Sequence, residues 1–410
     1  MAFAEIMHSV VDILGSTGGH DPGRTLIADG RSAGSCSAPV YTVLLQGRRA
    51  QPRCARPAER PVPDTIPAMG WNDDVARYVV VAILLGLIPF YYWRRARFRR
   101  RNRSMNAELN EIARLDQSGE YAEAERRCLA LQDRCTQPDR PADRAAIFRS
   151  SMQLAAARVA VGRLAEAEAD LAEVVRELGP DHRPDLASAW QVTAFLAWVV
   201  VQRGRYAEGI SIAERVVREC AKRWGDTAAV TMGAKHTLIT CLTEGDRPEQ
   251  ALPLASARLE YALSTHDEQS GFVTSARHCL AEAQLKLGLL DEAEAGLHAS
   301  LAGYEPQLAD RIAGTGVRFA LAKIAALRGQ VGEAREGFYV VLNVLQDATG
   351  PAGPWALLTR FELAELDART GDLDSALATH RSVLADRERV LGPEHPLTVA
   401  SRLAVEKCAS

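Results

Sequence analysis

The amino-acid sequence predicts an all-α protein, a solenoid of stacked antiparallel helix pairs preceded by a single transmembrane helix. Two observations predict the solenoid. A phrase with a central glycine recurs about every 42 residues through residues 105–410, and each copy holds two apolar-periodic segments of helical length. Such segments cannot bury their apolar faces alone and must stack on their neighbours. The third observation predicts the transmembrane helix: the 16 uncharged residues of Tyr78–Trp93 run directly into seven arginines within the next ten positions.

Composition and charge exclude several classes of protein. The chain has 410 residues and a net charge of -3, but residues 1–103 carry a balance of +7 and residues 104–410 a balance of -10. Because an acidic surface repels a phosphate backbone, no nucleic-acid partner is expected. The eight cysteines form no Cys-x-x-Cys pair, and no Cys/His cluster has the spacing of a zinc site. The sequence therefore predicts no metal, no cofactor, and reduced, buried thiols.

The N-terminal segment, residues 1–70, shows no sustained period and is rich in Gly, Pro, Ser and Arg. A segment of this composition buries too little apolar surface to fold, so it is predicted to be disordered. Translation from Met69 is an alternative that would leave most of this segment out of the protein.

The apolar run that follows is predicted to span a membrane over residues 71–93. As a helix, Tyr78–Trp93 would measure about 24 Å against a hydrocarbon core of roughly 30 Å, and Arg77 can reach one interface while Tyr91 to Trp93 occupy the other. A cleaved signal peptide would carry its positive charge before the run, whereas here the arginines follow it. The basic stretch at 94–104 either sets the topology alone or also contacts anionic lipid. We therefore expect a single-pass protein of the cell membrane with its C-terminal repeat domain in the cytoplasm.

The repeat consists of seven copies of one short phrase, of which "VGRLAEAE" and "LGLLDEAE" are typical. Successive copies are 41 to 43 residues apart, and a Leu-Ala pair stands eight residues before the glycine in five of them. The glycine position is occupied, in order, by Gly119, Gly162, Gly204, Asp246, Gly288, Gly329 and Gly371. A period held through seven copies is typical of a repeat architecture.

Each copy is predicted to fold as helix, turn and helix. The glycine can adopt the left-handed conformation that ends the first helix, and acidic residues often open the second, where they suit the helix dipole. A small residue five positions after the glycine marks the point at which the two helices must cross closely. These small residues are Ala124, Ala167, Gly209, Ala251, Ala293, Ala334 and Ala376.

On these residues the chain resembles the tetratricopeptide repeat (TPR) family, in the order Leu-Ala, then Gly-x-aromatic or aliphatic, then Glu-Ala. The period and linkers such as "LGPEHPLTVAS" (Leu391–Ser401) are similar to those of the kinesin-light-chain-like subgroup, whose repeats are about 42 residues long. The resemblance covers residues 105–410 and implies a right-handed superhelical solenoid of about seven TPR units closed by a C-terminal helix. It implies a protein or peptide partner without specifying which. The asparagines that the subgroup carries just before the Leu-Ala pair are missing here, so no asparagine-based binding mode is expected.

The candidate binding residues follow from the same resemblance. The sequence holds no His-Glu-x-x-His, no Gly-x-Ser-x-Gly and no phosphate-loop lysine, so it predicts a binding protein without catalytic residues and not an enzyme. In the resembled family the first helix of each pair lines a concave groove. Positions four apart on either side of the Leu-Ala pair share one helix face. They supply the partner-binding candidates Met152, Trp198, His236, His278, Glu282, Phe319, Lys323, Phe361 and Glu365.

The aromatic candidates are the expected anchors, because buried aromatic side chains carry most interface energy. Aromatic residues at helical spacing also pack as core, and this interpretation stays open for Trp198 in particular. His236 and His278 occupy equivalent places in neighbouring repeats and either converge on an anion or line a solvated groove. The predicted function is a membrane-anchored, cytoplasm-facing scaffold or adaptor that docks a protein or peptide. The alternative is a sensor whose groove binds a small signal peptide.

Overall fold

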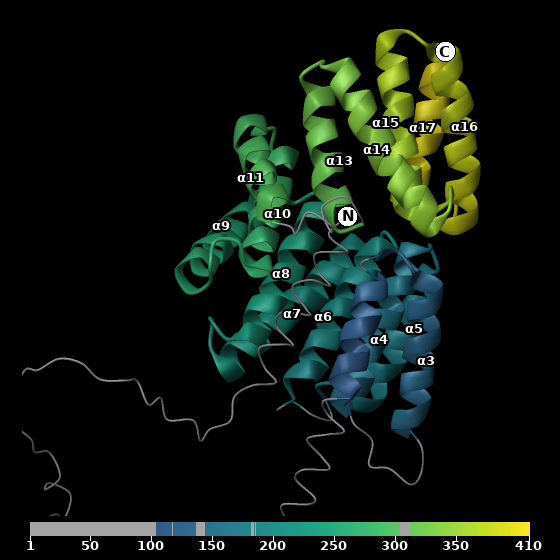
Figure 1. The fold of residues 1–410 in the computed structure, drawn as a ribbon. Helices are drawn as coiled ribbons and strands as arrows, with labels where there is room; N and C mark the ends of the chain where they lie inside the picture. Colours follow the sequence, from purple (N-terminus) through teal and green to yellow (C-terminus); the bar gives the residue numbers. More distant parts are fainter. Residues whose placement is uncertain (1–103, 117, 137–143, 182–183, 185, 304–311) are drawn as a thin grey trace, which may run out of the picture. The chain divides into compact units, whose positions relative to one another are not determined.

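The computed structural model describes residues 104–410 except 117, 137–143, 182–183, 185 and 304–311. In this part of the chain every regular element is an α-helix, as Figure 1 shows, which confirms the all-α part of the predicted fold class. The segments predicted at 1–70 and 71–93, and nearly all of the basic stretch at 94–104, lie outside the described residues. The described residues all belong to one compact unit.

The location in the cell membrane that the sequence predicted is wrong, because the described helices do not support it. None of the helices in the described part of the chain combines the length and the apolar character needed to cross a membrane. The most apolar of them, α6 (Ala187–Gln202), has 16 residues, and most of its large side chains are buried against neighbouring helices. The apolar run that suggested an anchor and the arginines that follow it lie outside the described residues.

The helices pair in chain order, and consecutive helices joined by short turns pack side by side. A helix over residues 104–116 pairs with α3 (Tyr121–Thr136). The next pairs are α4 (Arg144–Ala160) with α5 (Leu164–Leu178), α6 with α7 (Tyr206–Trp224), α8 (Ala229–Glu244) with α9 (Pro248–Thr265), α10 (Gly271–Lys286) with α11 (Leu290–Gly303), α13 (Ile312–Leu327) with α14 (Val331–Thr349), and α15 (Pro354–Thr370) with α16 (Leu373–Val390). A last helix, α17 (Pro396–Ala409), follows without a partner. The described residues therefore hold the seven pairs and the terminal helix that the repeat predicts.

The turns between paired helices have the conformation expected at the glycine position. All six turn glycines have positive φ, between 75° and 89°, and Asp246 has φ 57°. In the described residues Asp246 is the one non-glycine residue with positive φ. Aspartate tolerates this region better than most side chains, so the degenerate copy keeps the same turn.

The small residue of each second helix lies where the two helices cross. The six alanines at this position are completely buried. At Gly209 even a methyl group would not fit, because a Cβ atom would lie 2.6 Å from the carbonyl oxygen of Ala197 on α6. The predicted reason for small residues at this position is therefore confirmed.

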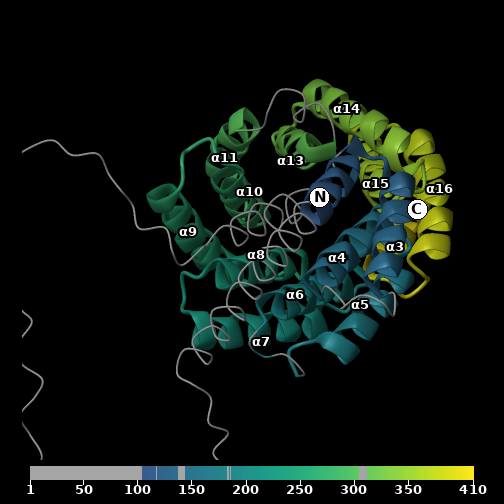
Figure 2. The same ribbon diagram turned by 60° about the horizontal axis from the view of Figure 1, so that its bottom comes forward.

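The two helices of each pair lie at different depths in the unit. Each first helix contacts the next first helix along the chain, from α4 through α6, α8, α10 and α13 to α15. Figure 2 shows these helices on the inner side and the second helices, such as α7, α14 and α16, on the outer side. Residues that face inward from several repeats must therefore come from first helices, as the resemblance implies.

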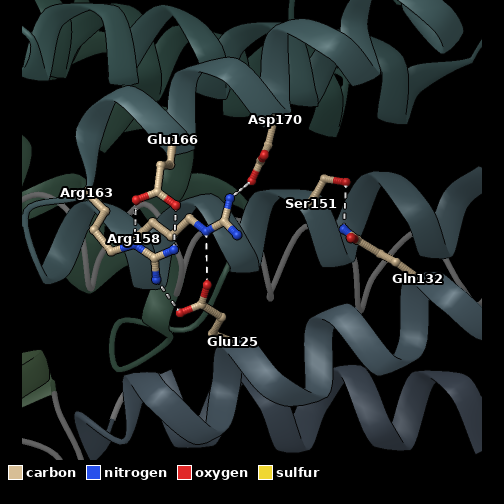
Figure 3. Close-up of polar contacts among 7 residues, drawn as sticks. All are labelled: Glu125, Gln132, Ser151, Arg158, Arg163, Glu166 and Asp170. Carbon is tan, nitrogen blue, oxygen red and sulfur yellow. Dashed lines mark hydrogen bonds and ion pairs between the residues drawn. The ribbon is translucent and has the colours of Figure 1, made fainter.

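Ion pairs between successive repeats form at the second acidic position of the repeated phrase. Figure 3 shows Glu125 on α3 accepting hydrogen bonds from Arg158 Nε at 3.1 Å and from Arg163 Nη1 at 2.7 Å. Arg158 also bonds Asp170, and Arg163 bonds Glu166. One carboxylate thus ties the second helix of a repeat to the turn of the next.

Equivalent positions in other repeats make the same connection. Glu168 on α5 bonds both Arg203 and Arg205, and Glu294 on α11 bonds Arg328 at 2.7 Å. In the sixth repeat the charges are exchanged, because Arg335 on α14 donates to Asp367 on α15 at 2.6 Å. In four of the seven copies this position therefore carries one member of an ion pair between repeats, and in the other three it holds Ile210, Leu252 and Leu377.

We expect the pair between Glu125 and Arg158 to contribute about 1 kcal/mol of coupling energy, the upper end for ion pairs that solvent still screens. Their side chains are 20% and 11% exposed. The coupling is measured by chemical denaturation of wild type, Glu125→Ala, Arg158→Ala and the double variant. The same cycle on Arg176 and Glu173, which are 70% and 65% exposed with a 3.7 Å separation, should give almost none. Equal coupling for both pairs would contradict a structural role for the inter-repeat pairs.

Candidate functional site

The first helices enclose a pocket of about 440 Å³, called the inner pocket here. Its walls come from the ends of α6 and α8, from α10, α13 and α15, from the start of α7, and from the start of α17. Its polar and aromatic lining consists of Gln202, Tyr206, Thr243, Glu244, Glu282, Lys286, Phe319, Lys323, Trp355, Glu362 and His395. One site therefore draws side chains from five successive repeats and from the terminal helix.

Three of the residues predicted from the sequence line the inner pocket: Glu282, Phe319 and Lys323. Phe319 is partly buried, and its ring packs against Phe338 on α14 with 5.4 Å between centroids. Lys323 forms an ion pair with Glu362 of the next first helix. That Glu282, Phe319 and Lys323 bind a partner stays a prediction.

Four other predicted residues lie in the core between helices. Met152, Trp198, His236 and His278 have exposed fractions of 2%, 0%, 1% and 0%. The Trp198 ring packs against Phe195 with 5.2 Å between centroids. The core interpretation that the sequence left open for Trp198 is the one found in the structure. None of the four can contact a partner in this conformation, because neighbouring helices cover them.

The two remaining predicted residues, Phe361 and Glu365 on α15, face α16 and do not line the pocket. The Phe361 ring packs edge-on against His380 at 5.0 Å, and Arg387 lies over it at 4.8 Å. Glu365 lies 3.2 Å from Nε2 of His380. Burial lowers the pKa of Arg387 to about 10. These contacts give Phe361 and Glu365 a role in packing α15 on α16.

The carboxylates of the inner pocket differ in their electrostatic environments. Burial raises the pKa of Glu244 to about 7, and the carboxylate of Glu282 adds to this shift. Burial would also raise the pKa of Glu282, but His278, 3.3 Å away, reverses the shift and lowers it. Glu282 therefore carries its charge at neutral pH, while Glu244 is poised between its two forms. A cation entering the pocket would favour the ionised form of Glu244.

The residues that sequence reasoning missed lie one helical turn closer to the turn glycine than the predicted ones. Gln202, Glu244, Lys286 and Leu327 each stand two residues before the glycine position of their repeat, and all four line the pocket. The repeat register could have identified them, because they share one position in four successive copies. Trp355 lies at the start of α15, and His395 lies in the linker just before α17. The predicted positions were taken only from the middle of each first helix, so they did not include these two residues.

A buried histidine gives the fold a measurable pH dependence. Burial, with Arg258 and His278 adding to it, lowers the pKa of His236 well below its usual value, and its Nδ1 lies 3.3 Å from Sγ of Cys279. The unfolded chain takes up a proton near pH 6.5 and the folded chain does not, so this residue makes the fold less stable as pH falls below about 6.5.

The free energy of unfolding should fall less steeply between pH 7.5 and 5.5 in His236→Gln than in wild type. The difference in slope is at most about 1.4 kcal/mol per pH unit below pH 6.5. Urea denaturation at several pH values measures this difference from wild type. His298→Gln on the exposed side of α11 is the control and should keep the wild-type pH dependence. An unchanged slope in His236→Gln would show that His236 takes up its proton in the folded state as readily as in the unfolded chain.

Comparisons with known proteins were made by family model, by sequence and by structure. No protein-family model matches this chain, and no curated protein matches it. Among solved structures, the TPR-like repeats of a putative kinesin light chain from Podosopora anserina share 21% identity, with a TM-score of 0.37 over 50% of this chain and 98% of that one. BtubC (BKLC) from P. vanneervenii shares 18%, with a TM-score of 0.40 over 57% of this chain and 93% of that one.

A Rap protein in complex with competence and sporulation factor shares 13% identity, with a TM-score of 0.39 over 75% of this chain and 98% of that one. Likenesses at this level carry no argument about function. The description of this chain as a helical-repeat protein rests on its own seven helix pairs.

Proposed function

We propose that this protein is a binding scaffold or adaptor that holds a linear peptide segment of a partner protein in the inner pocket. The observation that supports the proposal is the pocket itself: about 440 Å³, with aromatic side chains and charges of both signs supplied by five repeats and α17. Pockets that bind ligands commonly measure about 300–1,000 Å³ and combine an apolar lining with a few convergent polar groups.

The chemistry of the lining favours a peptide with one apolar anchor and one basic group. Phe319, Trp355 and Tyr206 offer aromatic surface, which supplies most of the free energy in such interfaces. Lys323 and Glu362 already neutralise one another, whereas Glu244 is bonded by the uncharged amide of Gln202. A basic side chain would therefore gain most from a position beside Glu244, where it would hold that carboxylate in its ionised form.

A sensor that binds a small signal peptide is the second candidate. It is favoured by the size of the pocket, because about 440 Å³ lined by five repeats and α17 fits a short segment better than a folded domain. The two candidates differ in what remains bound to the peptide: a scaffold holds a whole partner protein through it, whereas a sensor binds the peptide alone.

The test is selection of peptides from a random display library on the immobilised full-length protein. We expect wild type to return a convergent sequence motif with an apolar and a basic position. Glu244→Gln and the double variant Phe319→Ala with Trp355→Ala should bind the selected peptide more weakly, the double variant by roughly 2 kcal/mol or more, the range of interface hot spots. Titration calorimetry with the synthetic peptide measures these losses.

The matched control is Tyr339→Ala on the outer helix α14, where the side chain is 49% exposed. It should bind the peptide as wild type does. Because Phe319 also packs on Phe338, the melting temperature of each variant is recorded with its affinity. Full-strength binding by folded pocket variants would overturn the proposal, and so would a selection that returns no convergent motif.

A further inference from the structure

Parts of the chain nearly 200 residues apart meet at the turns of the first three repeats. A Cβ atom at Gly119 would lie 3.4 Å from a side-chain carbon of Ile312, and one at Gly162 would lie 3.5 Å from Cδ of Pro354. A Cβ atom at Gly204 would overlap Cδ of Pro396. Ile312, Pro354 and Pro396 are the first residues of α13, α15 and α17. Each contact joins a turn glycine to the start of a first helix 192 or 193 residues later.

The constant separation along the chain shows that these three contacts belong to one regular interface. This interface, between the turns of the first three repeats and the starts of α13, α15 and α17, is called the seam here. The ends of the second helices that pair with α13 and α15 take part as well, because Cβ atoms at Gly119 and Gly162 would lie 2.6 Å from Ala348 on α14 and from Val390 on α16, respectively. By contrast, a Cβ atom at Gly288, Gly329 or Gly371 would meet no atom within 4 Å. The turn glycines of the first three repeats therefore serve both the local turn and the seam, whereas the later ones serve the turn alone.

The last contact of the seam also contains a directed hydrogen bond. Nδ1 of His395 accepts from the backbone N–H of Leu397 at 3.2 Å, which caps α17. Nε2 of the same ring lies 3.0 Å from the carbonyl oxygen of Gln202, the last residue of α6. A carbonyl can only accept, so Nε2 carries the proton and the neutral ring serves both partners. Burial, reinforced by Arg387, lowers the pKa of His395 and thereby favours this neutral form.

The same bond exists at no other contact of the seam in the described residues. Gly353 occupies the position of His395 before α15 and has no side chain to reach across. His395 is only 6% exposed, so its ring is held between the two parts of the chain. The contact of α17 with the turn Gln202–Gly204 is therefore the best-defined point of the seam.

This contact is also a wall of the inner pocket. Val201, Gln202 and Tyr206 line the pocket from one side of the seam, and His395 and Leu397 line it from the other. In the described residues α17 packs on α16 and on the seam, and its Leu403 side chain is 60% exposed. A helix held by one neighbour and one seam opens more easily than a helix inside the array.

We propose that α17 is a latch for the inner pocket: docked on the turn Gln202–Gly204 it completes the pocket wall and holds the bound peptide, and undocked it releases that peptide. This inference rests on the proposed function, because it concerns the regulation of the same site. The coupling between peptide and latch is reciprocal. If the docked latch strengthens peptide binding by some factor, the bound peptide stabilises the docked latch by the same factor.

The test compares two variants that impose the same backbone strain at a turn, of which only one also disturbs the seam. Gly204→Ala and Gly329→Ala place the same side chain at the same turn position, with φ 79° and 78°, but only the first meets α17. His395→Asn is the second seam variant, because asparagine keeps the N-cap while its shorter side chain loses the bond to Gln202. Amide hydrogen exchange of the full-length protein reports the latch without any ligand. Dissociation of the library-selected peptide reports the pocket.

We expect exchange in α17 to rise at least tenfold in Gly204→Ala and His395→Asn, with exchange in α13 unchanged, and peptide dissociation to accelerate at least tenfold. Gly329→Ala should leave α17 exchange and peptide dissociation at wild-type values. Unchanged exchange in α17 would overturn the latch. Faster exchange with unchanged peptide dissociation would show that the latch forms but does not regulate the pocket, which also overturns the proposal. Failure to select any peptide is the failure of the proposed function, and the exchange data would still show separately whether the seam is closed.

Discussion

Replacing Trp198 by alanine is expected to lower the free energy of unfolding by about 3–5 kcal/mol, the range for truncating a large aromatic residue in a packed core. The indole is completely buried and belongs to an apolar cluster that contains residues of every helix from α3 to α10. Its removal leaves a cavity. The surrounding helices cannot move in to fill it, because each of them also packs against other helices. Urea denaturation with an unchanged m-value measures the loss.

Two variants make this result specific to the position. Trp198→Phe keeps most of the volume and should recover much of the lost stability, because it leaves a smaller cavity. Trp224→Ala at the end of α7, where the side chain is only partly buried, should cost clearly less. If Trp198→Ala instead kept its stability and lost affinity for the selected peptide, the indole would belong to the binding surface, as the sequence had allowed.

Replacing Gly209 by alanine is expected to lower stability by about 1–3 kcal/mol, the usual cost of overpacking. Helix propensity alone predicts the opposite, a gain of up to about 1 kcal/mol for Gly→Ala inside a helix. The difference arises from the close crossing of α7 and α6: a Cβ atom at Gly209 would lie 2.5 Å from Cγ2 of Val201 and 2.6 Å from the carbonyl oxygen of Ala197. A backbone carbonyl cannot move aside as the end of a flexible side chain can.

Gly332→Ala on α14 is the matched control, because a Cβ atom there would meet nothing within 4 Å. It should stabilise the protein by up to about 1 kcal/mol, so the two variants are expected to differ by about 1–4 kcal/mol. Thermal and urea denaturation of both proteins give the comparison. A stabilised Gly209→Ala would mean that α6 and α7 do not cross closely at this position.

The sequence by itself determined the repeat and its internal construction. The left-handed turn at Asp246 and the buried crossing position at Ala293 both follow from the register of one repeated phrase. They are local properties: a turn depends on one residue's φ, and a helix crossing depends on two side chains within a single repeat. Local hydropathy was a weaker guide, because it led to a membrane location that the helices of the described chain do not support.

Only the tertiary structure decided which inward positions are buried and which line a pocket. Met152 and Phe319 both stand ten residues before the turn glycine of their repeats, yet Met152 is core and Phe319 lines the inner pocket. The contact of His395 with Gln202 joins residues 193 positions apart. The physical reason is that each repeat adds a small rotation to the one before it, and the sum over many repeats sets which distant surfaces meet. No single repeat encodes that sum, so the pocket and the seam that closes it could be found only in the folded chain.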